Sequence, residues 1–363
     1  VLVSTVLNRD FAEWFSSMIS TFSYRIKDSG CAETLLAMAR SVNYVWNFCN
    51  ETQLHAIKWD KRWPTGFDLS KLSSGSSKEL GLHSQSVQAI CEEYAIRRKQ
   101  AKKRKLRWRG KKSLGWIPFK ASGVKVVEDT VTYCGRSFRF WLSRHIAGKV
   151  KTGSFSQNAQ GHWFVNFQCE VDQPEASDGS GSIGIDLGLK DFAVFSHGEP
   201  IQAQQFYRDM EPKLAIAQRA KKKYRVRAIH AKIAKHKKDH LHKLSTRLVR
   251  ENAVIFVGDV NASGLAKTKM AKSVLDAGWS AFRAMLCYKA IARKVWLEEI
   301  DERFSTQTCS ECGSLGGPKG LKGLVIRDWT CQGCGVAHNR DTNSAKVILA
   351  RGHARLAVGI PVL

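Results

Sequence analysis

The sequence predicts a multidomain chain of mixed α/β class, with a β-rich first half that contains a helical insertion and a second half in which strands and helices alternate. Three observations carry this prediction. The chain has 363 residues, enough for two or three domains at roughly 150 residues each. Apolar residues make up 43%, an ordinary value for a protein with a buried core. Short aromatic and β-branched runs fill residues 115–171, whereas strands alternate with helical patterns after residue 182.

The first half divides by its local patterns. Residues 22–30 predict a short strand, and residues 1–21 are expected to be a leader, either a start-site artefact or a disordered segment. Residues 31–103 repeat apolar residues at three- and four-residue spacing, which predicts a helical lobe. The strands expected in 115–171 suit a small β-barrel together with the strand at 22–30. The polar residues 172–182 contain Pro and Gly and are expected to be the linker between domains.

The second half is predicted to form a mixed sheet covered by helices. The expected elements are two strands joined by a turn in 182–196, a basic helix over 211–250, a buried strand at 253–260, a helix over 264–293, a strand at 294–300 and a last helix over 341–351.

The charge balance indicates the kind of partner. Lys and Arg total 58 against 32 Asp and Glu, a formal net charge of +26, and such an excess in a folded chain usually means a nucleic-acid partner. No run is apolar enough for a spanning helix, which needs about 20 residues, so no membrane partner is expected. The first twenty residues lack the pattern of a secretory signal, and the cysteine usage suits a reducing compartment. We therefore expect a cytoplasmic protein.

A run of basic residues at 97–112 has eleven Lys or Arg in sixteen positions. Charges of one sign repel each other, and Trp108 within the run offers a stacking surface, so we expect a nucleic-acid contact rather than only a solvated face. The expected contact residues are Lys102, Lys103, Arg104, Lys105, Arg107, Trp108 and Arg109. Polar residues of the preceding helix are candidates for reading bases or, equally, the polar side of a packed helix: Asn43, Asn47, Asn50 and Gln53.

Four of the ten cysteines form two CxxC pairs separated by eighteen residues: Cys309, Cys312, Cys331 and Cys334. This spacing places four thiolates around one tetrahedral Zn²⁺, and a site closed by four protein ligands is structural. Gly313 and Gly335 follow the pairs directly, which helps each turn fold back on the metal. The alternative is four free thiols. The other six cysteines are expected to be free thiols of the core.

Two aspartates stand in conspicuous settings. Asp186 lies between two glycines at the end of an apolar strand, in GIDLG, and Asp341 lies at the start of the last helix, in NRDTN. Taken singly, Asp186 could be a turn residue and Asp341 a helix cap. Carboxylates that converge from separate elements, however, are how proteins hold two Mg²⁺ ions against a phosphodiester.

The motif GIDLGLKDFAVFS, the CxxC pairs and NRDTNSAKVIL occur in this order along the chain. Their combination resembles the RuvC-type nuclease of the TnpB (OrfB) proteins of bacterial insertion sequences, RNA-guided DNA endonucleases related to the type V CRISPR effectors. The resemblance covers about residues 22–351. It implies a guide RNA from the element, a double-stranded DNA target with a short adjacent motif, two catalytic Mg²⁺ ions and one structural Zn²⁺. It also implies a nucleoid-associated protein of a prokaryote. The oligomeric state stays open.

The resemblance also implies the architecture. An oligonucleotide-binding-like β-barrel would carry an inserted helical recognition lobe, and a RuvC-like domain of RNase H fold would be interrupted by a zinc ribbon. The expected bounds are 22–30 and 104–171 for the barrel, 31–103 for the lobe, 183–305 and 338–363 for the RuvC-like domain, and 306–337 for the ribbon.

One position departs from the family pattern. The second acidic motif of the family usually ends its strand with Glu followed by Asp, whereas this chain has Gly258 followed by Asp259. Asp259 could substitute, but a slip of one residue in a strand turns the side chain to the opposite face. The nuclease could instead be inactive, leaving an RNA-guided DNA-binding protein. Alternatively, the carboxylate has moved to a neighbouring strand.

We favour the third alternative. Alternation along residues 294–304 places Glu302 between Ile300 and Phe304, two residues expected to be buried, so Glu302 is expected to point inward. A carboxylate in such a place needs a partner or a cation, and the competing interpretation is an ion pair with a local Arg or Lys. The predicted catalytic set is Asp186, Glu302 and Asp341, holding two Mg²⁺ ions about 4 Å apart, with Asp259 as the alternative to Glu302. A third function, a zinc-ribbon accessory factor of transposition that uses no guide, also fits the charge.

Overall fold

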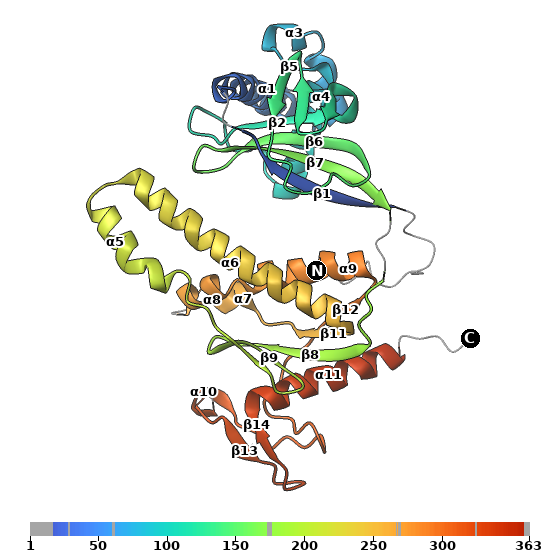
Figure 1. The fold of residues 1–363 in the computed structure, drawn as a ribbon, viewed down its shortest axis with the longest axis vertical. Coiled ribbons are helices and arrows are strands. Elements are labelled where there is room, and N and C mark those ends of the chain that lie inside the picture. Colours follow the sequence, from blue (N-terminus) through green and yellow to red (C-terminus); the bar gives the residue numbers. More distant parts are fainter. Residues whose placement is uncertain are drawn as a thin grey trace. The chain divides into compact units, whose positions relative to one another are not determined.

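The computed structural model describes residues 17–27, 30–59, 62–172, 176–265, 267, 270–323 and 325–358. They form two compact units, Val1–Gln173 and Pro174–Leu363, so the division lies within the expected linker (Figure 1). No helix in the described part of the chain has the length and apolar character needed to cross a membrane.

The first unit is built on two antiparallel sheets that share a core. The four-stranded sheet has the order β1-β7-β6-β2 and the three-stranded sheet the order β3-β4-β5, and a bridge between Ile26 and Phe140 connects them. The strands are β1 (Ser17–Arg25), β2 (Trp116–Lys120), β3 (Val124–Val127), β4 (Thr130–Tyr133), β5 (Arg136–Arg139), β6 (Lys149–Gln157) and β7 (Trp163–Asp172). A 3-10 turn, η1 (Ala121–Gly123), follows β2.

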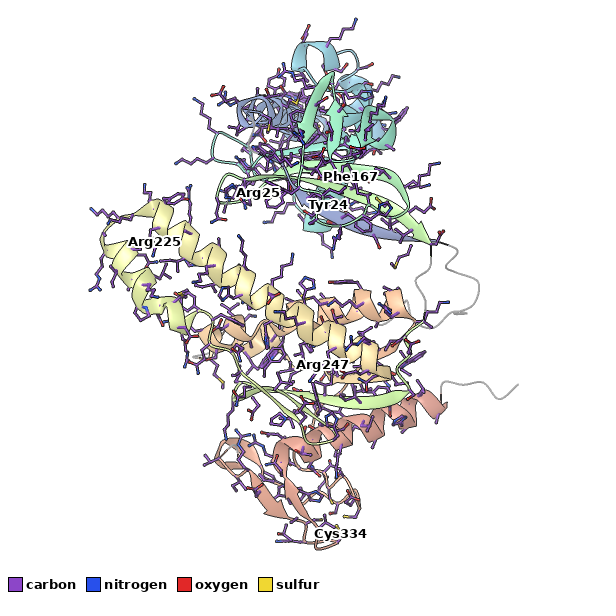
Figure 2. All side chains as sticks on the ribbon, viewed as in Figure 1. Tyr24, Arg25, Phe167, Arg225, Arg247 and Cys334 are labelled. Atoms are coloured by element: carbon purple, nitrogen blue, oxygen red, sulfur yellow. The ribbon has the colours of Figure 1, made fainter. Side chains whose placement is uncertain are left out.

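Strand β1 begins earlier than the sequence predicts. Ser17 pairs with Asp172 and Phe22 with Phe167, so residues 17–21 of the expected leader belong to the sheet, whereas residues 1–16 lie outside the described residues. Alternation along β1 and β7 turns Tyr24 and Phe167 into the core, where their ring centroids lie 6.1 Å apart (Figure 2).

Four helices lie between β1 and β2 in the chain: α1 (Ala32–Trp59), α2 (Gly66–Leu72), α3 (Ser77–Leu80) and α4 (Ser84–Ala101). Helix α2 starts with a capping box between Thr65 and Asp68. Helices α1 and α4 pack against each other and against β2 through buried apolar residues such as Val42 and Ile90. Helix α4 ends where Lys102 adopts a left-handed conformation, with φ 51°.

The second unit contains a five-stranded sheet of order β10-β9-β8-β11-β12, in which β8, β11 and β12 are parallel and β9 is antiparallel to both of its neighbours. Figure 1 shows α6 and α9 on one face of this sheet and α11 on the other, which explains why the inner strands β8 and β11 are mostly apolar on both faces. The strands are β8 (Gly181–Leu187), β9 (Asp191–Phe195), β10 (Pro200–Gln202), β11 (Asn252–Gly258) and β12 (Trp296–Ile300).

The helices of this unit are shorter or longer than the sequence predicts. The basic stretch is a hairpin that turns at Lys221 (φ 52°), and Arg225 lies near that turn (Figure 2). The predicted helix over 264–293 is broken at Gly278 (φ 74°). The helices are η2 (Arg208–Met210), α5 (Glu211–Arg219), α6 (Lys223–Glu251), α7 (Ala262–Leu265), α8 (Ala271–Ala277), α9 (Trp279–Arg293), and α11 (Arg340–Val358), which extends beyond its predicted end. The cysteine-containing segment before α11 holds α10 (Gly320–Gly323), β13 (Asp328–Thr330) and β14 (Ala337–Asn339).

Candidate functional site

The three predicted carboxylates line one pocket of about 770 Å³ in the second unit. Asp186 is the penultimate residue of β8, Glu302 follows the end of β12, and Asp341 lies in the first turn of α11. Strands β8 and β12 run parallel on either side of β11, so their carboxyl ends meet at the same edge of the sheet. This edge is where open α/β sheets usually bind ligands.

Helix α11 reaches Asp186 because β8 has a glycine where the helix crosses it. A Cβ added to Gly184 would clash with the carbonyl oxygen of Ala345, so only glycine permits this close approach. The side chain of Asn339 accepts hydrogen bonds from the backbone N–H of Asp341 (3.2 Å) and Thr342 (3.3 Å). Asn339 therefore caps the helix, and the alternative in which Asp341 is the cap is wrong.

The Asp186 carboxylate accepts a hydrogen bond from one serine, and its pKa is raised. The Ser344 hydroxyl donates a hydrogen bond to Asp186 Oδ1 (3.0 Å), and the hydroxyls of Ser344 and Ser305 lie 2.7 Å apart. Burial raises the pKa of Asp186 to about 7, and the charges of Asp341 and Glu302 act in the same direction. A cation between these groups would relieve both effects.

Glu302 occupies the space beside Gly258. A Cβ added to Gly258 would lie 2.9 Å from Glu302 Oε2, so this carboxylate stands where a side chain at position 258 would begin. Burial raises the pKa of Glu302 to about 7, with the charge of Asp259 as the next cause. The structure thus brings an acid from the segment after β12 to the end of β11.

The predicted reason for this placement is wrong, however. Strand β12 ends at Ile300, and Phe304 is 60% exposed with φ 61°, so strand alternation does not continue to residue 304. A turn after β12 sets the direction of Glu302 instead. Its backbone N–H donates to Asp259 Oδ1 (3.1 Å), and its carbonyl accepts from Ser305 N (3.0 Å). Asp259 itself is exposed and lies outside the residues that line the pocket.

Two arginines that sequence reasoning missed pair with Asp341. Arg327 Nη1 contacts Asp341 Oδ2, and Arg340 Nε donates to Asp341 Oδ1 (2.9 Å). The buried Arg340 also donates to the Gly323 carbonyl oxygen (3.1 Å). A signal for one of them was present, because Arg340 directly precedes Asp341. The protein therefore supplies its own positive charge opposite this carboxylate.

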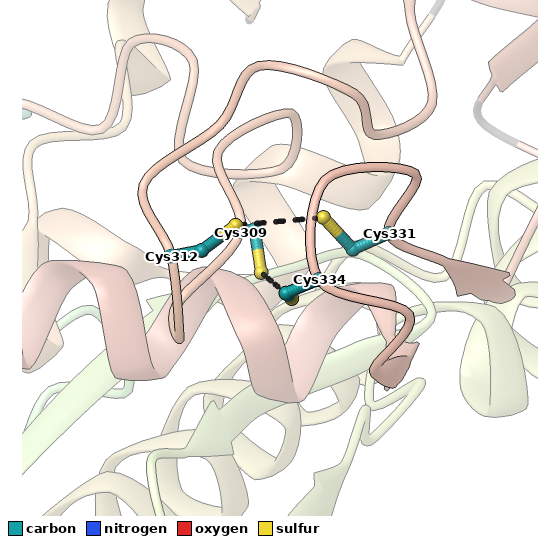
Figure 3. Close-up of side chains that lie close together, drawn as sticks. All are labelled: Cys309, Cys312, Cys331 and Cys334. Atoms are coloured by element: carbon teal, nitrogen blue, oxygen red, sulfur yellow. Dashed lines mark hydrogen bonds between the residues drawn. The ribbon is translucent and has the colours of Figure 1, made fainter.

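The four predicted zinc ligands come together. Their Sγ atoms all lie within 4.8 Å of one another, and among the described residues this is the one group of three or more His, Cys, Asp or Glu side chains that could hold a metal ion. Figure 3 shows Cys309 beside Cys334 (3.7 Å) and Cys312 beside Cys331 (3.6 Å). The two loops have the same backbone geometry: Gly313 and Gly335 both have positive φ, and each donates its N–H to the carbonyl of the first cysteine of its pair. Such a sulfur set suits Zn²⁺.

The cysteine cluster is attached to the start of α11. The completely buried side chain of Asn343 accepts from Ser310 N (2.9 Å) and donates to the Thr308 carbonyl oxygen (2.7 Å). A further residue that sequence reasoning missed, His338, places Nε2 3.0 Å from Cys309 Sγ. The loop that carries the first CxxC pair is thus fixed two residues from Asp341.

The residues of the basic run differ in exposure. Arg109 is turned into the protein, where its Nε donates to Asn43 Oδ1 (2.6 Å) and its Nη2 to the Leu114 carbonyl oxygen (2.8 Å). Desolvation by burial lowers its pKa. Arg109 is therefore partly buried and bonded within the fold, and its nucleic-acid contact stays a prediction. The others are exposed: Lys102, Lys103, Arg104, Lys105, Arg107 and Trp108.

The four polar residues of α1 are not free to read bases. Asn50 and Gln53 are completely buried, and the amides of Asn47, Asn50 and Gln53 bind the backbone of the basic run. They belong to the packed side of the helix, which was the alternative that the sequence left open.

Two family models match parts of the chain within residues 166–348. Residues 166–269 match a family model described as "Probable transposase" (OrfB), and residues 279–348 match one described as "Cas12f1-like, TNB domain". A relative from Streptomyces pristinaespiralis is 37% identical over 57% of this chain and 54% of its own length, and one from Escherichia coli K12 is 29% identical over 61% of each. Both carry the name "Putative RNA-guided DNA endonuclease". The chain thus spans between half and two thirds of the length of these relatives.

The fold is also similar to a solved structure. The Cas12f1 chain of a Cas12f1–sgRNA–target DNA complex matches 88% of this chain and 82% of its own length, with a TM-score of 0.59 and 12% sequence identity. At that identity the match shows the mixed α/β multidomain fold alone.

Proposed function

We propose that this chain, whose resemblance to the TnpB (OrfB) proteins is confirmed by these matches, is an RNA-guided DNA endonuclease of a transposable element. The observation that carries the proposal is the single pocket shared by Asp186, Glu302 and Asp341. Three parallel strands with helices on both faces support a RuvC-like domain of RNase H fold around this pocket.

The pocket suits Mg²⁺, because carboxylate oxygens are its preferred protein ligands. Burial raises the pKa values of Asp186 and Glu302, an effect that a bound cation would offset. Asp186, Glu302 and Asp341 would hold two ions. Bound there, Mg²⁺ polarises a phosphodiester and lowers the pKa of an attacking water. The chain itself orients the ligands: Ser344 fixes Asp186, and Asp259 fixes the backbone of Glu302.

The other parts of the chain have supporting roles in this proposal. The four cysteines would hold one Zn²⁺ in a closed, structural site of the ribbon at 306–337. The first unit would comprise an oligonucleotide-binding-like barrel and the recognition lobe at 31–103, which together with the exposed basic run would contact the guide RNA and the DNA target. Guide pairing would choose the sequence, and the protein would read a short motif beside the target.

A nuclease-inactive RNA-guided DNA-binding protein remains the second candidate, because Gly258 replaces the usual second ligand. The position of Glu302 Oε2 beside Gly258 favours the active nuclease.

The test uses the full chain purified with its RNA and a plasmid that carries the matching target. The wild type is expected to cut with Mg²⁺, whereas Asp186→Ala, Glu302→Ala and Asp341→Ala each abolish cutting and retain guided binding. Asp301→Asn is the matched control, because Asp301 precedes Glu302 but pairs with the exposed Arg303. A wild type that binds its target and never cuts with Mg²⁺ or Mn²⁺ would establish the inactive binder. The absence of any copurified RNA would favour the accessory factor.

A second pair of variants separates Glu302 from Asp259. Asp259→Asn keeps an oxygen that accepts the Glu302 N–H, and Asp259→Ala does not. If Asp259 only positions Glu302, the Asn variant cuts well and the Ala variant cuts slowly. If Asp259 is the metal ligand, both variants are inactive.

A further inference from the structure

The segment 104–109 of the basic run lies along α1 and is paired with side-chain amides of that helix. Asn50 Nδ2 donates to the Leu106 carbonyl oxygen (2.9 Å) and Asn50 Oδ1 accepts from Leu106 N (2.9 Å). Asn47 makes the same two bonds with Arg109, at 2.8 and 2.9 Å. Gln53 Nε2 donates to the Arg104 carbonyl oxygen (3.3 Å). We call these three side chains the amide ladder.

The spacing explains the pairing. Residues 47 and 50 are neighbours on one face of the helix, and their partners 106 and 109 are also three residues apart, in the opposite direction along the chain. A carboxamide has a hydrogen-bond donor and an acceptor, as a peptide group has. Each asparagine therefore makes the two hydrogen bonds that a residue of a neighbouring strand would make with an extended segment. A run of like charges would repel itself as a free loop, and the ladder fixes its backbone instead.

The ladder is fixed by its buried members, because Asn50 and Gln53 are completely buried and hydrogen-bonded, whereas Asn47 is partly exposed. Asn50 Oδ1 also accepts from the Tyr94 hydroxyl (2.8 Å), and Trp46 Nε1 donates to the Arg107 carbonyl oxygen (3.3 Å). Buried polar networks with every member paired specify one arrangement. With the backbone held from inside, Lys105, Arg107 and Trp108 are left facing solvent, and Trp108 is 45% exposed.

A groove of about 860 Å³ runs beside the segment. Its lining includes three indole rings and basic side chains such as Arg107 and Lys112. Arg109 also lines the groove and lies over the rings of Trp46 (5.8 Å) and Trp116 (6.0 Å), so Trp108 is the exposed indole. Aromatic faces that stack bases, next to cations that bind phosphates, are the two parts of a surface for single-stranded nucleic acid.

We propose that Asn47 and Asn50 are positioning residues that hold 104–109 as a pre-formed edge for one nucleic-acid strand, with an unpaired base stacked on Trp108 and a phosphate on Arg107. Preorganisation of this kind lowers the entropy lost on binding. The inference deepens the proposed function, because the strand would be the guide RNA or a DNA strand of the target. It does not depend on cleavage.

The test measures affinity of the full chain, freed of copurified RNA, for labelled single-stranded RNA and single-stranded DNA in EDTA. Asn47→Leu removes both bonds to Arg109 at a partly exposed position and is expected to lower affinity for at least one strand about tenfold. Asn47→Asp keeps the acceptor for Arg109 N and is expected to give an intermediate loss. Hydrogen exchange of the Arg109 amide should accelerate in the same order. The strand that loses affinity is the one bound at this edge.

Tyr133→Phe is the matched control. It removes an equally buried hydroxyl of the same unit, bonded to Ser86 Oγ (2.7 Å) away from the segment, and should leave affinity unchanged. A double-mutant cycle gives the second readout: Trp108→Ala should lower affinity alone and cost little more in the Asn47→Leu background, because Asn47 acts through the position of Trp108.

Three results would overturn the proposal: unchanged affinity for both strands in Asn47→Leu despite faster exchange at Arg109, an equal loss in Tyr133→Phe, or fully additive effects of Asn47→Leu and Trp108→Ala. Since binding is measured without divalent metal, failure here is distinguishable from failure of the nuclease assignment, which the cleavage assay decides.

Discussion

Replacing Asp186 with asparagine should stabilise the metal-free protein above pH 7 while abolishing cleavage. Burial, with Asp341 and Glu302 acting in the same direction, raises the pKa of Asp186 from 3.8 to about 7. A carboxyl group with a higher pKa in the folded state binds more protons when folded, so the free energy of unfolding falls as pH rises from 3.8 to about 7. Asparagine stays neutral, and its amide oxygen still accepts the Ser344 hydroxyl hydrogen bond.

The size of the effect follows from the pKa difference. A rise from 3.8 to about 7 corresponds to about 4 kcal/mol at about 1.4 kcal/mol per pKa unit. This is an upper limit, because the pocket opens to solvent and water screens the carboxylate. Asp186→Asn should therefore gain up to about 4 kcal/mol over the wild type at about pH 8 and little at about pH 4.

The assay is urea unfolding in EDTA at those two pH values, followed by the same measurement at about pH 8 with added Mg²⁺. Mg²⁺ should stabilise the wild type and have little effect on the variant, because it binds the folded wild type more tightly. Asp301→Asn is a control of opposite sign: the Arg303 hydrogen bond lowers the pKa of Asp301 to about 2, so its stabilising effect is present above pH 3.8 and lost as pH falls towards 2. Equal gains for Asp186→Asn at both pH values would refute the reasoning.

Three further predictions concern the neighbouring sites. Gly258→Glu should abolish cleavage, because a Cβ at position 258 would lie 2.9 Å from Glu302 Oε2. Adding Glu302→Ala to this variant should recover cleavage in part. No recovery in the plasmid assay would contradict a shared ligand position. Cys312→Ser should lose about one Zn²⁺ per chain together with folding or solubility, and a folded, zinc-free and fully active variant, measured by metal analysis and cleavage, would disprove the zinc site. Changing four exposed basic residues to Gln should weaken nucleic-acid binding, namely Lys102, Lys103, Arg104 and Lys105. The magnitude of the slope of log affinity against log salt concentration should fall by roughly one for each lost contact. An unchanged slope would mean that these residues form only a solvated face.

The sequence predicts most strongly what depends on local pattern. The CxxC spacing and the flanking Gly313 and Gly335 suffice to predict the cysteine cluster, because metal ligands and positive-φ turns are set by nearby residues. The prediction of Glu302 rests on a wrong premise, since alternation cannot show that β12 ends at Ile300 and that a turn then reorients the chain.

Long-range polar contacts are what the sequence could not show. The pairing of Asn47 and Asn50 with residues 106 and 109 depends on the packing of α1 against the basic run, which no spacing within either segment reveals. The ion pair of Arg327 with Asp341 likewise needs the folded cysteine-containing segment. Charge alone could not separate the inward Arg109 from its exposed neighbours either.

The attachment through Asn343 has a consequence for the cell. Because Asn343 ties the loop of Cys309 and Cys312 to the helix turn that carries Asp341, the two proposed metal sites share one anchoring point. Under the proposed function, a chain made under zinc starvation would have a poorly anchored Asp341, whereas the proposed nucleic-acid surface belongs to the other unit. The fraction of protein that can cleave DNA would then rise and fall with the zinc supply of the host, even though zinc would take no part in the cleavage reaction. Protein–RNA complexes that bind without cleaving would then occupy their DNA targets and exclude cleavage-competent copies of the protein.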